Sequence, residues 1–454
     1  MSEVVATAQQ GLAGKYPPYP KYKDSGVVWL GGIPNHWISV QSRRLFSLRN
    51  TRARAGDRQL AATQKYGVIF QDIFMELEGR RVVQVQIGAE ILKHVEPGDF
   101  VISMRSFQGG IEYCPYEGCV SSAYVPLTPI KWVHPDYFRY LFKSSPYIQA
   151  LQSTSNLVRD GQALRFENFS LVDLPVVPID EQRTIATFLD YETARIDRLI
   201  AQQQRLIELL KEKRQAVISH AVTKGLNPNA PMKDSGVEWL GQVPEHWEAL
   251  PIKYVSWFVG TGGTPKDRDS FTDENEINWF TPGDFNGELV LDDSGKYVTK
   301  GSILSGDAKI YPAESVLIVG IGATLGKVGV CNFKFSCNQQ INIVTPNRKI
   351  AVDFLAFSLL AQTEQMKQTS NASTIGIMNQ EKTKGIQIAV PPVQEQTSLI
   401  IHLKKKLSDF SLTTSKAEQL IALLQERRSA LISAAVTGKI DLRGWTPPAE
   451  EVAA

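Results

Sequence analysis

The chain has 454 residues, enough for two or three domains that each have their own core. Its composition, 43% hydrophobic and 21% charged, is that of a globular protein and excludes a disordered or fibrous chain. Because the formal net charge is only +2, any nucleic-acid-binding surface must concentrate its basic residues locally.

The chain carries no sign of export or of a membrane span. No apolar run approaches the roughly 18 residues that a span requires. Residues 1–20 lack the basic start and apolar stretch of a secretory signal, and we predict a flexible tail there. Four cysteines in a chain of this length form no disulfide framework, which fits a reducing compartment. We therefore expect a cytoplasmic protein without a membrane partner.

An internal repeat determines the domain organisation. Residues 23–37, KDSGVVWLGGIPNHW, and residues 233–247, KDSGVEWLGQVPEHW, are identical at 11 of 15 positions. Residues 206–223 and 420–437 match at 12 of 18 positions. The two spacings, 210 and 214, agree closely and are too long for a solenoid unit. The chain is therefore predicted to hold two copies of one module.

Each half ends in a long helical pattern. Pro178 and Pro392 lie just before the predicted starts, and Gly225 and Gly438 lie just past the ends. Apolar residues recur at three-and-four spacing, as in a coiled-coil seam: Ile185, Leu189, Ile196, Leu199, Leu206, Leu210 and Val217, then Leu399, Leu403, Phe410, Leu420, Leu424 and Leu431. Two such seams predict antiparallel helices of about 40 residues, roughly 60 Å long. A single solvated helix in each half is the alternative.

The region between block and helix is predicted to be mixed α/β in both halves. Residues 95–129 and 311–346 have β-rich runs, Gly-containing turns, two cysteines and then a polar pair. The pair is Ser121 and Ser122 in one copy, and Gln339 and Gln340 in the other. The expected fold is therefore two similar globular domains separated by an antiparallel pair of long coiled-coil-like helices, with a pseudo-two-fold internal repeat. The differing polar pairs suggest different targets.

Three sequence patterns resemble catalytic or metal-binding sites but lack residues that such sites need. The segment 320–328, GIGATLGKV, resembles a phosphate loop, but its glycines are too close and Val328 replaces the magnesium-binding hydroxyl, which favours a β-turn. The cysteine pairs lie in different copies, so they do not supply four zinc ligands. His36 and His246 adjoin tryptophans and are interpreted as packing or capping residues. We predict no catalytic residue and no metal site.

The chain resembles the specificity subunit of type I restriction-modification systems over nearly its whole length. The matching elements are the two KDSGV blocks, the P-x-x-EQ helix starts at 178–182 and 392–396, and the helix ends KEKRQAVISHAVTKG and QERRSALISAAVTGKID. Segments inside the domains, PGDFVISMRSFQGG, GGTP, INWFTPGD and CNQQ, are similar to the family's target-recognition domains. One departure, HAVTKGLNP in the first copy, affects only a linker.

The resemblance implies an organisation into six parts. They are a flexible tail (1–20), target-recognition domain 1 (21–175), helical spacer 1 (176–225), a linker with target-recognition domain 2 (226–389), helical spacer 2 (390–440) and a tail (441–454).

The resemblance also implies a function. The chain would be a non-catalytic subunit that reads a bipartite, asymmetric target in double-stranded DNA. It would recruit two methyltransferase subunits and motor/nuclease subunits. S-adenosylmethionine, ATP and Mg would bind to those partners, leaving no cofactor in this chain.

Candidate DNA-binding residues follow from residue type and placement on turns. For base contacts in the first domain we select Arg105, Ser106, Gln108, Ser121 and Ser122. For phosphate contacts we select Arg49, Arg52 and Arg54, from a run with six arginines and one acid between Ile38 and Leu60. In the second domain we select Thr264, Lys266, Lys327, Gln339, Gln340 and Thr374. An ordinary surface role is the alternative for each.

Two other functions compete with DNA reading. A nucleotide-dependent enzyme would use segment 320–328 and would bind ATP as an isolated chain. A coiled-coil protein-interaction scaffold would show no sequence-dependent, salt-sensitive affinity for DNA. A methylation-only or fused type II system could also use a subunit of this kind.

Overall fold

A computed structural model of the chain describes residues 15–79, 91–103, 106–130, 132–154, 164–370 and 377–448. It divides the chain into two compact units. Unit 1 comprises Met1–Gln204 and Glu418–Ala454, and unit 2 comprises Arg205–Ala417. Both boundaries fall inside the long helices, so each unit contains the globular part of one repeat and a segment of each helix.

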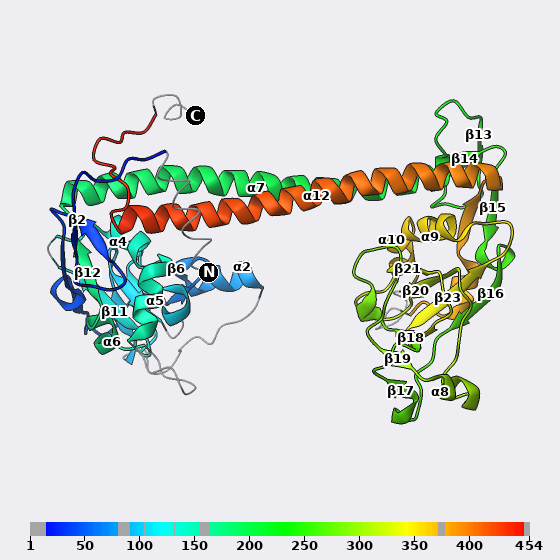
Figure 1. The fold of residues 1–454 in the computed structure, drawn as a ribbon, viewed down its shortest axis with the longest axis horizontal. Coiled ribbons are helices and arrows are strands. Elements are labelled where there is room, and N and C mark those ends of the chain that lie inside the picture. Colours follow the sequence, from blue (N-terminus) through cyan, green and yellow to red (C-terminus); the bar gives the residue numbers. More distant parts are fainter. Residues whose placement is uncertain are drawn as a thin grey trace. The chain divides into compact units, whose positions relative to one another are not determined.

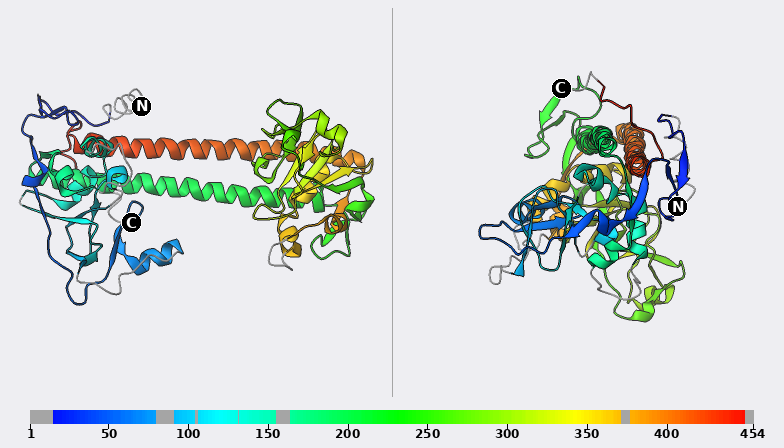
Figure 2. Two further views of the ribbon diagram at one scale, coloured as in Figure 1. Left: turned by 90° about the horizontal axis from the view of Figure 1, so that it is seen from below. Right: turned by 90° about the vertical axis from the view of Figure 1, so that its left-hand side faces the viewer.

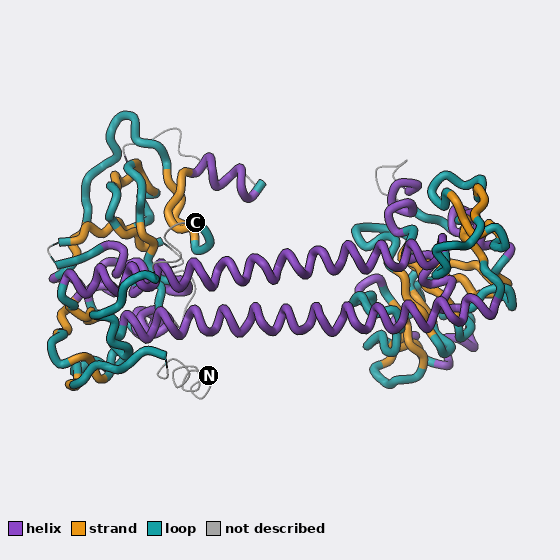
Figure 3. Tube along the Cα trace, turned by 90° about the horizontal axis from the view of Figure 1, so that it is seen from above, coloured by secondary structure: helices purple, strands orange, loops and turns teal. Residues whose placement is uncertain are grey.

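The two predicted long helices are present. Helix α7 (Ile179–Lys224) has 46 residues and α12 (Val393–Val436) has 44, and both are unbroken (Figures 1 and 3). Each starts directly after the predicted proline, which lacks the N–H that a first helical turn leaves unpaired. Gly225 and Gly438 follow the helix ends with φ of +73° and +71°. This left-handed backbone conformation commonly terminates an α-helix.

The helices pack against each other within each unit. In unit 1, Arg428 Nε of α12 donates to Asp197 Oδ1 of α7 at 3.0 Å, and Ile196 and Leu424 share one core. The first part of α7 thus lies beside the last part of α12 (Figure 2). The core of unit 2 also contains residues from both helices: Ile218, Ala221, Val222, Leu399 and Leu403. The prediction of an antiparallel pair is confirmed.

The predicted seam is only partly buried. Ile185, Leu189 and Leu403 are fully buried, as expected. Leu199, Leu206 and Leu420 are instead 40%, 37% and 41% exposed, and for these three the seam prediction is wrong. A helix with one partner buries only a narrow stripe, so leucines beside that stripe remain in contact with water.

The globular parts of the two units share one topology. In unit 1 the antiparallel sheet β4-β11-β8-β9 is formed by Phe46–Leu48, Val125–Pro129, Phe100–Ile102 and Glu112–Tyr113. In unit 2 the equivalent sheet β16-β23-β20-β21 is formed by Ser256–Thr261, Ile341–Pro346, Ser315–Val319 and Val328–Cys331. Equal strand order in both copies confirms the predicted duplication.

The remaining shared elements also occur in the same chain order. Each unit has two antiparallel strand pairs, β1 with β2 (Tyr22–Asp24, Gly32–Pro34) and β3 with β12 (Ile38–Gln41, Asp173–Val176), matched by β13 with β14 (Met232–Asp234, Gln242–Pro244) and β15 with β24 (Glu248–Pro251, Gln387–Val390). Each has a 3₁₀ turn, η1 (Ser42–Arg44) or η3 (Ile252–Tyr254). Three short helices complete each unit: α4, α5 and α6 (Pro135–Leu141, Ser145–Ser153, Phe166–Ser170), or α9, α10 and α11 (Val352–Leu360, Thr363–Ser370, Gln380–Gly385).

The units differ in the segments inserted around the sheet. Unit 1 has β5 (Leu60–Thr63), β6 (Gly67–Phe70), α2 (Gln71–Glu78), β7 (Lys93–Val95), α3 (Ser106–Gly109) and β10 (Gly118–Val120). Unit 2 has η4 (Arg268–Ser270), β17 (Phe271–Thr272), β18 (Ile277–Phe280), η5 (Pro282–Asp284), β19 (Tyr297–Val298), α8 (Lys300–Ser305) and β22 (Ser336–Cys337).

The repeated sequence block anchors each globular part to the start of a long helix. In unit 1, Trp37 Nε1 donates to Glu181 Oε1 at 3.1 Å and His36 Nε2 lies 2.8 Å from Glu181 Oε2. In unit 2, Trp247 and His246 contact Glu395 at the same two distances, 3.1 and 2.8 Å. The two histidines therefore pack and pair at a helix start, in agreement with the prediction.

The glutamine of each P-x-x-EQ motif is a second anchor, and both are fully buried. Gln182 accepts a hydrogen bond from His134 N and donates to the carbonyls of Trp132 and Val177. In unit 2 the same three bonds join Gln396 to Ala351 N, Lys349 O and Pro391 O. The repeated residues thus serve the junction between globular part and helix.

Candidate nucleic-acid interface

Most of the candidate residues lie on loops at one edge of each sheet. In unit 2, strands β16 and β20 end at this edge and β23 begins there, because Thr261 pairs with Asn342 and Val319 pairs with Ile341. Three loops, 262–266, 320–327 and 338–340, therefore meet at the edge. Backbone hydrogen bonds join them: Gly263 N to Cys337 O at 2.8 Å and Gly320 N to Gln340 O at 2.8 Å.

The close approach of these loops depends on glycine. A Cβ on Gly262 would lie 2.1 Å from Asn338 O and 2.5 Å from Cys337 O, so no larger residue fits. The GGTP and CNQQ segments are 75 positions apart along the chain and lie side by side in the fold, as the contact of Thr264 with Gln339 shows. The sequence thus specifies a tightly packed base for an exposed polar tip.

The described candidate residues of unit 2 differ in exposure and in their hydrogen-bond partners. Thr264 and Gln339 are exposed, and the Thr264 hydroxyl bonds to the Gln339 side chain. Gln340 is half-buried, and Lys266 is exposed. Lys327 donates from Nζ to Phe285 O at 2.6 Å, so it also holds a neighbouring loop. Thr374 lies outside the described residues.

Segment 320–327 is a tight turn between two antiparallel strands. Leu325 N donates to Gly322 O at 3.1 Å, and Gly326 N closes the turn onto Val319 O at 2.9 Å. The β-turn predicted here is confirmed. This turn connects β20 and β21 at the end of the sheet where the three loops meet.

Unit 1 has an equivalent edge, where β4 and β8 end and β9 and β11 begin. Gln108, Ser122 and Arg52 are exposed there, and Ser121 is half-buried. Arg52 forms a backbone bridge with Lys93. Lys93 in turn pairs with Val120, the residue directly before Ser121. Arg105 lies outside the described residues.

Ser106 has a local structural role. Its side chain belongs to a residue only 1% exposed, and its hydroxyl accepts from Ser103 N at 2.8 Å. This bond caps the turn that starts α3. A side chain so placed can contact DNA only if the turn opens.

Arg49 and Arg54 are held by acids. Arg49 Nε lies 2.6 Å from Asp99 Oδ2, and its side chain is only 14% exposed. Arg54 pairs with Glu96 at 3.3 Å and with Glu117 at 3.4 Å. Sequence spacing does not reveal these acidic partners, because they lie 42 to 63 positions away along the chain. Among the three candidate phosphate contacts, only Arg52 has no acidic partner within the described part of unit 1.

The cysteines occupy equivalent buried positions in the two units. Cys119 precedes the Ser121–Ser122 pair and bridges Gln59 in parallel; Cys337 precedes the Gln339–Gln340 pair and bridges Phe280 in parallel. Burial raises the pKa of Cys114 and Cys119 to about 11. All four thiols are unpaired and buried, which indicates packing residues.

Within the described residues, no helix has the length and apolar character needed to cross a bilayer.

Known proteins resemble this chain in sequence and in fold. Residues 244–422 match the family described as "Type I restriction modification DNA specificity domain". The putative type I restriction enzyme MjaX specificity subunit of Methanocaldococcus jannaschii is 20% identical over 359 residues, 79% of each chain. The EcoKI specificity subunit of Escherichia coli K12 is 22% identical over 373 residues, 76% of this chain and 75% of that protein.

Solved structures share the fold. The HsdS subunit of Thermoanaerobacter tengcongensis aligns with a TM-score of 0.52 at 15% identity, covering 90% of this chain and 98% of that one. A chain from a study of "complex assembly" and "conformational transition of the type I R-M system" aligns with a TM-score of 0.69 at 14% identity, covering 89% and 98%. The resemblance to type I specificity subunits is confirmed, and with it the two-domain fold.

Proposed function

We propose that this chain, which carries a type I restriction modification DNA specificity domain over residues 244–422, reads the DNA target of a type I restriction-modification complex. One observation carries the proposal. Two units of equal topology present unlike polar side chains at the same sheet edge: Ser121 and Ser122 in one, Gln339 and Gln340 in the other. Recognition of two different DNA sequences requires two domains of one fold whose exposed polar side chains differ.

The target is bipartite and asymmetric in this proposal. Each unit reads one half-site, and the half-sites differ because the edge residues differ. Glutamine offers a donor and an acceptor to adenine, whereas serine bonds to several base edges. The pseudo-two-fold repeat supports half-sites that face in opposite directions on one duplex.

Mapping methylated bases in cells that express the complex tests this assignment. A Gln339→Ala, Gln340→Ala chain should relax the second half-site and leave the first intact. The matched Ser121→Ala, Ser122→Ala chain should do the reverse. Equal changes in both half-sites from either chain would contradict the proposal.

The helix pair acts as a spacer that fixes the unread gap. A stiff element shared by both units sets the separation of their edges, and successive DNA grooves are about 34–36 Å apart. Inserting four residues, about one helical turn, into both α7 and α12 should change the gap length and preserve both half-site sequences. Altered half-sites would show that the helices do more than space the units.

The chain itself supplies no chemistry in this proposal. Two methyltransferase subunits and the motor/nuclease subunits bind to it, and S-adenosylmethionine, ATP and Mg act on those partners. The complex would work in the cytoplasm, where its DNA lies.

A coiled-coil scaffold that binds only protein is the remaining alternative. A gel-shift titration of the complex with target and random duplexes, at two salt concentrations, separates the two functions. Sequence reading predicts a large preference for the target, whereas a scaffold predicts none.

A further inference from the structure

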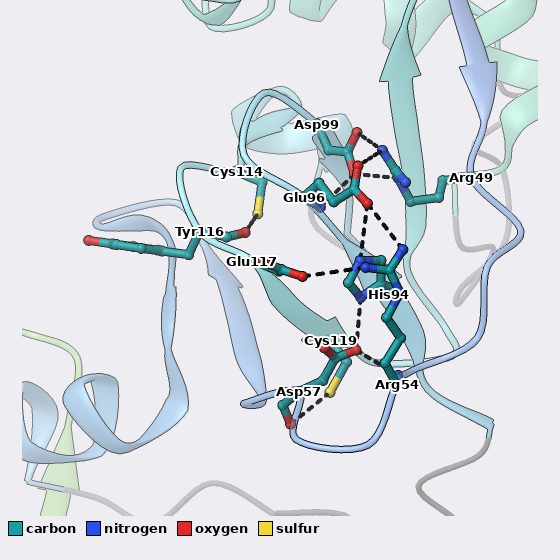
Figure 4. Close-up of polar contacts among 10 residues, drawn as sticks. All are labelled: Arg49, Arg54, Asp57, His94, Glu96, Asp99, Cys114, Tyr116, Glu117 and Cys119. Carbon is teal, nitrogen blue, oxygen red and sulfur yellow. Dashed lines mark hydrogen bonds and ion pairs between the residues drawn. The ribbon is translucent and has the colours of Figure 1, made fainter.

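A cluster of metal-ligating side chains lies in unit 1. Asp57 comes from the loop after β4, His94 from β7 and Glu117 from the turn before β10 (Figure 4). One ligand atom of each residue lies within 4.8 Å of those of the other two. The side chain of His94 is fully buried and that of Asp57 is 8% exposed.

The surroundings of His94 call for a cation. Its Nδ1 lies 2.8 Å from Asp57 Oδ2, and its Nε2 lies 3.4 Å from Glu96 Oε1. A neutral imidazole has one N–H, so it donates to only one of these oxygens. The other ring nitrogen then directs a lone pair at a carboxylate, which is repulsive unless a positive charge lies between them.

The charge balance of the cluster points the same way. Carboxylates outnumber guanidiniums by four to two among these described residues: Asp57, Glu96, Asp99 and Glu117 against Arg49 and Arg54. Of these four, Asp57 is the buried carboxylate that pairs with no guanidinium in the described part of the chain, so a cation beside it would compensate its charge.

We propose that Asp57, His94 and Glu117 bind a divalent metal ion of the zinc class at the Nδ1 side of the imidazole, while the Nε2–H of His94 donates to Glu96. One imidazole nitrogen with carboxylate oxygens is a donor set that zinc accepts in tetrahedral geometry. Glu117 is 62% exposed and is free to rotate toward His94 to shorten the present spacing. Arg54, which is 53% exposed, swings out as the ion replaces its charge.

The bound ion has a structural role. Its ligands come from three separate segments, so it ties the loop that follows β4 to the strands β7 and β10. That loop carries Arg52 and Arg54. No sequence pattern indicates this site, because Asp57 and His94 are 37 positions apart and fit no metal-binding motif. The site does not depend on the proposed function.

Metal binding is measured on the untagged full-length chain after chelation and dialysis. Loading with Zn²⁺ should leave about one ion per chain by elemental mass spectrometry, and Co²⁺ should give a visible absorption band of a tetrahedral site. His94→Gln and Glu117→Gln should each weaken the affinity at least about tenfold. His220→Gln, at an exposed histidine of α7, is the matched control and should bind as the original chain does.

Two results would overturn the proposal: no ion retained at one per chain, or unchanged affinity in both variants. Glu117 is exposed, so its variant keeps the fold, and circular dichroism checks this.

Discussion

At the residue level, one arginine run contains residues with opposite roles. Arg49 is mostly buried against Asp99, whereas Arg52 is exposed and has no acidic partner in the described part of unit 1. The sequence places both in one basic segment. It could not separate them, because the acids that capture Arg49 are brought in by β7 and the turn that follows it.

Arg49→Ala should lower the free energy of unfolding by about 3 kcal/mol, since it leaves the buried Asp99 carboxylate without its counter-charge.

Arg52→Ala should leave stability unchanged. If Arg52 contacts a phosphate, its loss should weaken binding to target and random duplexes alike. It should also reduce the slope of log affinity against log salt concentration by about one. Urea unfolding and salt-dependent gel shifts measure the two effects. A selective loss on the target alone would make Arg52 a base contact.

The buried glutamines should be the most sensitive polar residues of the junctions. Gln182→Ala or Gln396→Ala removes three hydrogen bonds and leaves buried backbone groups unpaired, so we expect a loss of about 2–4 kcal/mol. Gln202→Ala, at an exposed position of α7, should change stability by less than about 0.5 kcal/mol. Urea denaturation compares the three chains. Similar midpoints for all three would show that the anchors are dispensable.

At the element level, local signals predicted both helix ends. Proline and glycine act on the backbone of their own turn, so Pro178 and Gly225 mark α7 whatever packs around it. Burial along the helices was less predictable. The exposure of Leu199 and Leu420 depends on how wide a partner surface covers them, which spacing along one helix does not reveal.

The glycine after α12 should be intolerant of any side chain. Gly438 has φ of +71°, and a Cβ there would lie 2.5 Å from Pro34 Cδ and 3.0 Å from the Trp37 ring. Gly438→Ala should therefore destabilise the chain by more than about 1–2 kcal/mol, the cost of the left-handed backbone alone. Gly444→Ala, with open space around it, is the control. Thermal unfolding of both should show a lower Tm only for the first.

At the level of the whole molecule, the repeat boundary and the unit boundary differ. Unit 1 needs Leu424, Leu431 and Ile432 of α12 to complete its core, although these belong to the second repeat. Unit 2 likewise needs Ile218 and Val222 of the first repeat. The duplication was visible in the sequence, but this exchange of helix segments was not, because two equal seams do not say which ends meet.

Cutting the chain between the repeats should therefore not release two independent domains. Residues 1–225 expressed alone should self-associate or aggregate, because the surface that α12 covers becomes exposed. Coexpressed with residues 226–454, they should form a folded one-to-one complex. Copurification and light scattering measure this. A stable monomer of residues 1–225 would contradict the assignment of α12 to unit 1.

The matched junctions bear on how such chains evolve. Each globular segment sits in a socket of the same design: a tryptophan and histidine on a helix-start glutamate, a glutamine on three backbone groups, and a glycine after the opposite helix. The blocks around these junctions match at 11 of 15 and 12 of 18 positions, so a globular segment transferred with its own block would meet the same contacts in either half. Exchange of a whole globular segment would then keep the junction contacts and change only the side chains at the loop end of the sheet.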